Sequence, residues 1–168
     1  MPSGFIVPTR AGGSAANYAK YLTAELKPVI YQRYRTKPLA PDTAVGGASL
    51  GVLVSLWLAL HHGDIFGNAL VVSPSLWWDG ELMLQEVKKL KRPAAIAQIL
   101  RPKIWLDIGG KEGEAAVRAT RGLREALSER GWDSKRLAYL EQPNGTHDEA
   151  AWAQRVEPML RFMYGGQL

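Results

Sequence analysis

Four short apolar segments, each followed by sequence of helical character, constrain the fold of this chain more than any other feature. They cover residues 43–47, 69–73, 103–108 and 137–140. Runs of this length, bounded by turn residues, predict buried strands. Because strands alternate with helices, the sequence predicts an α/β fold in which helices cover both faces of a parallel sheet of about four or five strands. Ligands of such sheets bind at the carboxyl ends of the strands.

The intervening sequence predicts five helices, at residues 14–31, 50–62, 81–90, 114–130 and 149–164. Ser14 is the expected N-cap of the first helix, and Pro28 is expected to kink that helix or end it early. Apolar positions at helical spacing predict the buried faces of the last two helices. These positions are Val117, Thr120, Leu123 and Leu127 in the fourth helix and Trp152, Val156, Leu160 and Met163 in the fifth. No repeat or linker interrupts the pattern, so residues 1–168 are expected to form a single domain.

The composition excludes several kinds of site and partner. The chain of 168 residues has no cysteine, so disulfides and thiolate metal sites are ruled out. Its 3 histidines form one adjacent pair and one isolated residue, a poor supply of ligands for a metal centre. The formal net charge is +5, but the basic residues are scattered. Their densest group, residues 88–92, ends a predicted helix, where lysines favour the helix dipole, so we expect a solvated face and no nucleic-acid partner.

Membrane insertion and export have no signal in this sequence. No apolar run reaches the roughly 20 residues that a transmembrane helix needs. Residues 44–60 come closest, but glycines and serines interrupt them around a turn. The first residues lack the basic, apolar and small-residue regions of a signal peptide, so a cytoplasmic location is the default expectation.

A G-x-S-x-G motif joins the first predicted strand to the helix that follows it. The motif reads Gly47-Ala48-Ser49-Leu50-Gly51. A nucleophile elbow needs this spacing because its serine sits in a strained turn, and glycines two residues to either side let the neighbouring backbone pass without a Cβ clash. Ser49 is then the nucleophile, and the Leu50 amide faces the developing oxyanion. The alternative interpretation is a glycine-rich turn or a phosphate-binding loop.

The general base is found by elimination among the three histidines. His61 and His62 lie at the far end of the helix that follows Ser49, on the order of 18 Å away at a rise of about 1.5 Å per residue. His147 lies in a polar turn after the fourth predicted strand, at the sheet edge that also carries the elbow. His147 is therefore the predicted base.

The acid of such a triad should follow the preceding strand, which gives the chain order Ser, acid, His. The loop after residues 103–108 contains Glu112 and Glu114, and Glu112 is nearer the strand end. Glu114 also suits the first turn of a helix, where the dipole favours a carboxylate. Asp107 lies within the predicted strand, and Asp148 adjoins the base. Position alone makes Glu112 the predicted acid, with the other three carboxylates as alternatives.

Five segments form a combined pattern, in order along nearly the whole chain. They are Gly-Ala-Ser-Leu-Gly at 47–51, Ser-Pro-Ser-Leu-Trp-Trp at 73–78, Leu-Asp-Ile-Gly-Gly-Lys-Glu at 106–112, Gly-Thr-His-Asp-Glu-Ala-Ala-Trp at 145–152 and Phe-Met-Tyr-Gly at 162–165. This pattern resembles the carboxyl-terminal part of the enterochelin-esterase and esterase-D group of α/β-hydrolases. The resemblance implies a serine esterase that uses Ser49, His147 and Glu112 on a small-molecule ester, without a metal or other cofactor. It also implies that Trp77 and Trp78 lie near the acyl or aromatic part of the substrate.

The resemblance leaves two alternatives to ester hydrolysis. One is acyl transfer on the same triad, as in the related mycolyltransferases. The other is a catalytically weak half-domain that acts through assembly with a partner. This second alternative arises because the family's sheet has further strands before the segment matched here, and a loop among them supplies the second oxyanion donor. Residues 43–47 would then form an open, uncharged sheet edge. Either residues 1–9, with their apolar residues 5–7, fold back over this edge as a covering strand, or a second copy of the chain pairs with it. Of the two, we expect the homo-oligomer, because so short a strand would cover little of the exposed helix surface.

Overall fold

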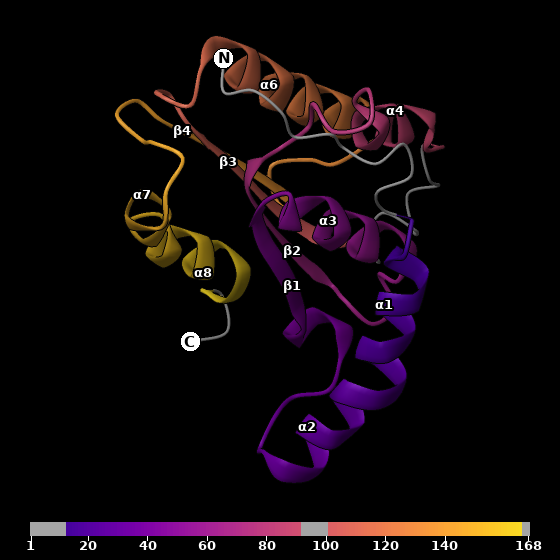
Figure 1. Cartoon of the computed structure of the whole chain (residues 1–168). Helices are drawn as coiled ribbons and strands as arrows, with labels where there is room; N and C mark the ends of the chain where they lie inside the picture. Colours follow the sequence, from indigo (N-terminus) through magenta and orange to yellow (C-terminus); the bar gives the residue numbers. More distant parts are fainter. Residues whose placement is uncertain (1–12, 92–100, 166–168) are drawn as a thin grey trace, which may run out of the picture. The chain divides into compact units, whose positions relative to one another are not determined.

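The computed structural model describes residues 13–91 and 101–165, and the chain divides into two compact units, Met1–Thr36 and Lys37–Leu168. The described part of the smaller unit is helical (Figure 1). It contains α1 (Ala15–Tyr21), a π-helical turn η1 (Leu22–Leu26) and α2 (Lys27–Arg33). All the predicted catalytic residues belong to the larger unit.

The first helix differs from its prediction at both ends. Pro28 lies in the first turn of α2, and the helix continues beyond it to Arg33, so the expected early end at Pro28 is wrong. The wide π-helical turn precedes the proline, which has no amide hydrogen to continue the ordinary bonding pattern. Ser14 makes no side-chain capping bond.

The larger unit contains a parallel sheet with the strand order β1-β2-β3-β4. Its strands are β1 (Ala44–Ser49), β2 (Asn68–Pro74), β3 (Lys103–Gly109) and β4 (Leu137–Gln142). The four predicted strands are confirmed, and each ends slightly later than predicted. Consecutive strands are neighbours throughout, so the carboxyl ends of all four meet at one edge of the sheet.

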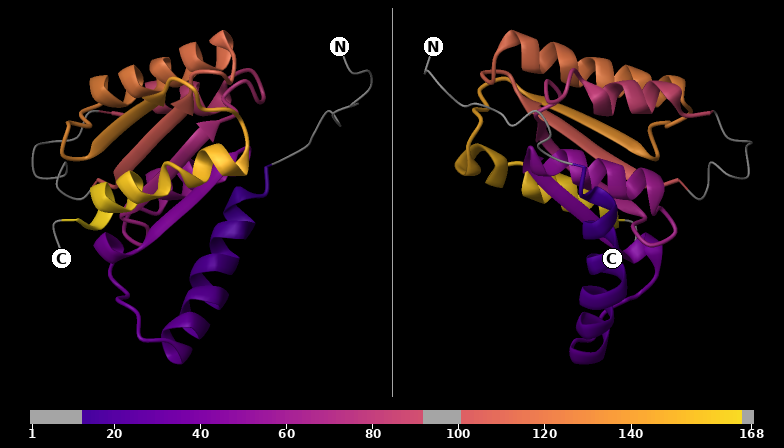
Figure 2. Two further views of the ribbon diagram at one scale, coloured as in Figure 1. Left: turned by 90° about the vertical axis from the view of Figure 1, so that its left-hand side faces the viewer. Right: turned by 45° about the vertical axis from the view of Figure 1, so that its right-hand side comes forward.

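Helices cover both faces of this sheet, as predicted (Figure 2). The helices on one face are α3 (Gly51–His61), α4 (Leu82–Lys89) and α6 (Glu114–Glu129), and those on the other are α7 (Glu149–Ala153) and α8 (Val156–Tyr164). A short 3₁₀ turn, η2 (Ala40–Asp42), precedes β1. Leu56, Leu106 and Leu123 are fully buried on the first face, and each such side chain contributes roughly 1.5–3 kcal/mol. Val72, Trp105 and Met163 form the core of the second face.

The predicted inner face of one helix is confirmed, and that of the other is partly wrong. All four predicted positions of α6 are buried. The predicted final helix is broken between Ala153 and Val156, which leaves Val156 43% and Leu160 45% exposed. Arg155 occupies the break and is 1% exposed. The break turns the polar Arg155 inward and changes the phase of the helix after it, so that Met159 is buried instead.

Among the described strands, β1 pairs with β2 alone, so its other side has no strand partner in the described part of the chain. Self-association through this edge, which the sequence predicts, stays a prediction. Residues 1–9, the alternative covering strand, lie outside the described residues. None of the described helices is long and apolar enough to cross a membrane.

Candidate active site

Ser49 lies at a sharp turn between β1 and α3. Its φ of 58° is in the left-handed region, which costs a non-glycine residue about 1–2 kcal/mol. A Cβ on Gly47 would lie 2.6 Å from the carbonyl carbon and oxygen of Gly51, so the turn requires glycine at position 47. A Cβ on Gly51 itself would meet nothing within 4 Å, so the expected clash at Gly51 is wrong. Leu50 follows Ser49 directly and precedes the first turn of α3.

The structure brings Ser49, His147 and Glu112 together. The Ser49 Oγ lies 3.0 Å from the His147 Nε2, and the His147 Nδ1 lies 2.7 Å from the Glu112 Oε2. His147 stands in the loop between β4 and α7, and Glu112 in the loop between β3 and α6. The Glu112 side chain is 2% exposed and that of His147 is 43% exposed. One imidazole therefore connects the elbow hydroxyl to a buried carboxylate.

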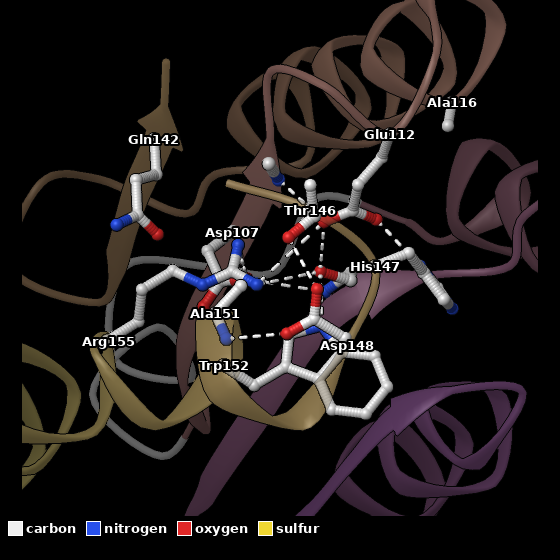
Figure 3. Close-up of polar contacts among 12 residues, drawn as sticks. Asp107, Glu112, Ala116, Gln142, Thr146, His147, Asp148, Ala151, Trp152 and Arg155 are labelled. Atoms are coloured by element: carbon white, nitrogen blue, oxygen red, sulfur yellow. Dashed lines mark hydrogen bonds and ion pairs between the residues drawn. The ribbon is translucent and has the colours of Figure 1, made fainter. Parts of the chain in front are cut away.

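The other candidate residues lie elsewhere. His61 is hydrogen-bonded to Glu86 of α4. The Glu114 side chain is exposed and pairs with Arg118 one helical turn away. Asp148 caps α7 by accepting a bond from the Ala151 amide, and it also accepts one from the Thr146 hydroxyl (Figure 3). These bonds, that from Thr146 above all, lower the pKa of the Asp148 carboxyl.

The second oxygen of Glu112 is held from several sides. The Glu112 Oε1 accepts hydrogen bonds from the Gly109 amide at 2.7 Å and from the Ser73 hydroxyl at 2.6 Å. A Cβ on Gly109 would lie 2.3 Å from the Gly145 carbonyl oxygen, so glycine is required where this loop packs against the loop that carries His147. These contacts fix the orientation of the Glu112 carboxylate, whose other oxygen contacts the imidazole.

Sequence reasoning missed the part that four side chains play around Ser49, Glu112 and His147. Ser75 contacts the nucleophile directly, because the two hydroxyl oxygens of Ser75 and Ser49 are 3.1 Å apart. The Trp152 ring packs edge-on against the His147 ring, with 5.2 Å between their centroids. Ser73 and Arg155 lie behind Glu112. A polar residue interrupting an apolar helical face was the available signal for Arg155. The serines of the 73–78 segment belonged to the family pattern, but nothing in the sequence assigned them a role.

A cavity of about 570 Å³ opens beside Ser49 and His147. Its lining includes Trp77, Glu81 and small side chains of α6 at Ala115, Ala116 and Ala119. Trp77 is 64% exposed and contacts Trp78 edge-on, with 5.8 Å between the ring centroids. Trp78 itself is not among the lining residues. The cavity lies at the carboxyl ends of the strands, where parallel sheets bind their ligands.

A serine on a strand–turn–helix elbow, with an acid and a histidine on loops after later strands, is the arrangement of the α/β-hydrolases. Comparison with known proteins agrees with this class. Residues 1–163 match the model of the Esterase family, described as "Putative esterase". The chain belongs to this esterase family.

Individual relatives are more distant. Uncharacterized protein YbbA of Bacillus subtilis is 22% identical over 164 residues, a match that covers 94% of this chain and 63% of YbbA. The siderophore enterobactin esterase of Emericella nidulans is 26% identical over 111 residues, or 66% of this chain and 36% of that protein. The crystal structure of the enterobactin esterase FES from Shigella flexneri superposes with a TM-score of 0.77 at 22% identity, over 91% of this chain and 39% of that one. The chain thus spans less than two thirds of the length of these relatives.

Proposed function

We propose that this protein hydrolyses small carboxylic esters, with short-chain or aromatic acyl groups, through a Ser49–His147–Glu112 triad. The observation that carries the proposal is the continuous contact from the Ser49 hydroxyl through His147 to the buried Glu112 carboxylate. Membership of the esterase family and the sequence similarity to a siderophore enterobactin esterase support the same chemistry.

In this reaction the Ser49 Oγ attacks the ester carbonyl carbon while the His147 Nε2 takes the hydroxyl proton. Glu112 accepts the Nδ1 hydrogen bond, which fixes the tautomer that leaves Nε2 able to accept a proton, and it stabilises the imidazolium that forms. The imidazolium then protonates the leaving alcohol. Water, activated by His147 in the same way, releases the acid from Ser49.

The developing oxyanion needs hydrogen-bond donors beside Ser49. We assign the Leu50 amide to this role because it directly follows the nucleophile at the beginning of α3, where the helix dipole also favours negative charge. Each donor of an oxyanion hole is worth about 100- to 1,000-fold in rate.

Covalent labelling tests the proposal most directly. We expect a fluorophosphonate probe to label the wild-type chain once, on the peptide containing Ser49, and to leave the folded Ser49→Ala variant unlabelled. Turnover of 4-nitrophenyl acetate should be lost in the same variant. The Ser75→Ala variant is the matched control and should still take the label on Ser49, because Ser75 lies beside the nucleophile but outside the elbow. Label that persists on Ser75 in Ser49→Ala would overturn the assignment.

Substrate size follows from the cavity. A volume of about 570 Å³ next to Trp77 accommodates a short acyl chain or an aromatic ring. We therefore expect kcat/KM for 4-nitrophenyl esters to be highest for acetyl, butyryl or benzoyl groups and to fall for long acyl chains. Trp77→Ala should raise KM for aromatic esters more than for acetate. A kcat/KM that climbs steadily from acetyl to palmitoyl would contradict this substrate class.

A further inference from the structure

Behind the triad, one buried cation stands between two buried carboxylates (Figure 3). The Arg155 Nη1 lies 3.0 Å from an Asp107 carboxylate oxygen, and the Arg155 Nη2 lies 3.8 Å from the Glu112 Oε1. The three side chains are 1%, 0% and 2% exposed in the order Arg155, Asp107, Glu112. Burying a charge costs several kcal/mol unless partners compensate it. Arg155 therefore compensates Glu112 as well as Asp107.

The charges in this cluster do not balance, since two carboxylates share one guanidinium. Burial raises the pKa of the Asp107 carboxyl, while a bond from the Trp105 indole, the charge of Arg155 and the Ser73 amide oppose the rise. Without Arg155, the two buried carboxylates would lose the guanidinium that lies between them.

Ser73 connects Arg155 to Glu112 in a second way. The Ser73 Oγ accepts hydrogen bonds from the Arg155 Nη2 and from the Trp152 Nε1, both at 3.0 Å. A hydroxyl has a single proton, and with both lone pairs occupied that proton points to the Glu112 Oε1, 2.6 Å away. Ser73 also has a left-handed φ of 47°, and its amide is bonded to Asp107. The Ser73 backbone is therefore strained in the conformation that directs its hydroxyl at Glu112.

We propose that Arg155, acting through Ser73 and by its charge, is a positioning residue for ester hydrolysis. Its charge and its bond to Ser73 hold the Glu112 carboxylate with Oε2 turned to His147, and so they set the pH at which the triad becomes active. This inference rests on the proposed function.

The direction of the pH effect follows from charge. The triad works when its shared imidazole–carboxylate pair has lost a proton, and removing a nearby cation makes that proton harder to lose, whichever atom holds it. Among the described residues, the titratable groups near the pair are Asp107 behind Glu112, Glu81 across the cavity, Asp148 directly after His147, and the exposed Lys111 directly before Glu112. Lys111 is the one cation among them, and because it is exposed, water screens its charge more than that of the buried Arg155.

The experiment is the pH profile of kcat and KM for 4-nitrophenyl acetate in the full chain. For Arg155→Met we expect kcat to fall about tenfold at neutral pH with KM little changed, and the acid limb of the profile to move up by about 0.5–1 pH unit.

Three further variants test the role of charge. Arg155→Lys should return the acid limb most of the way to its wild-type pH. Ser73→Ala should move the limb in the same direction as Arg155→Met, but by less. Asp107→Asn should move it to lower pH, because it removes a negative charge.

Arg161→Met is the matched control, since Arg161 lies on α8 and pairs with the exposed Glu157. Its pH profile should equal that of the wild type. If Arg155→Met does not fold, the opposite shifts of Ser73→Ala and Asp107→Asn test the same inference. Acid limbs that stay in place in the folded variants, with or without a fall in kcat, would overturn it. Failure of the proposed function looks different, because the wild type itself would then neither turn over the ester nor take the fluorophosphonate label on Ser49.

Discussion

Replacing His147 with alanine should lower kcat for short esters by about 10⁶-fold, the order of magnitude that loss of the catalytic histidine costs in subtilisin. In this chain the His147 Nε2 lies 3.0 Å from the Ser49 Oγ, and no other described histidine contacts that oxygen. Without the imidazole, the hydroxyl has no group to take its proton as it attacks the carbonyl carbon. Steady-state hydrolysis of 4-nitrophenyl acetate, with circular dichroism to verify folding, measures the effect.

The adjacent histidine pair provides the matched control for this prediction. His61 ends α3 and is bonded to Glu86 on the surface, away from the elbow at the other end of the helix. A variant with alanine at both 61 and 62 should hydrolyse the ester at the wild-type rate, with at most a small loss of stability. Comparable losses of activity in the two variants would disprove the assignment of His147 as the base.

Glu112→Gln should lower kcat by about 10⁴-fold, the effect of the equivalent change in a serine-protease triad. The surroundings of Glu112 make this substitution informative. Gly109 and Ser73 both donate hydrogen bonds to one carboxylate oxygen, so in glutamine the amide oxygen must take that place. The amide NH₂ then faces the His147 Nδ1, which stabilises the tautomer whose Nε2 carries a proton. That tautomer cannot accept the proton of Ser49.

Two further carboxylates serve as controls for the acid. Glu114 is exposed and bonded to Arg118, and Asp148 caps α7, so neither carboxylate is placed to orient the imidazole. Glu114→Gln should leave kcat unchanged. Asp148→Asn should change stability slightly, because asparagine is also a good N-cap. A 10⁴-fold loss in either variant, with Glu112→Gln active, would show that the acid is misassigned.

Several features of this protein could be predicted from local sequence. The strands at residues 69–73 and 103–108 are mainly apolar because both of their faces are buried, and α6 shows the spacing of a helix buried on one face. The G-x-S-x-G motif marks the turn, because Gly47 has no room for a Cβ. Parallel strands bring the residues that follow them to one edge of the sheet, and for this reason the sequence predicts that Ser49, Glu112 and His147 lie together.

Other features depend on contacts between segments far apart in the chain, and no local pattern records them. The last helix reads as continuous, yet it breaks at Arg155, because that guanidinium gains partners on β3 and in the following loop by turning inward. Ser73 reads as the end of a strand, yet Arg155, Trp152 and Glu112 converge on its hydroxyl. Sequence alone thus determined the sheet, the elbow and the order of the triad, since these follow from apolar periodicity and local backbone sterics. Tertiary structure alone decided what holds the Glu112 carboxylate against His147, because a buried charge is stable only where distant groups compensate it.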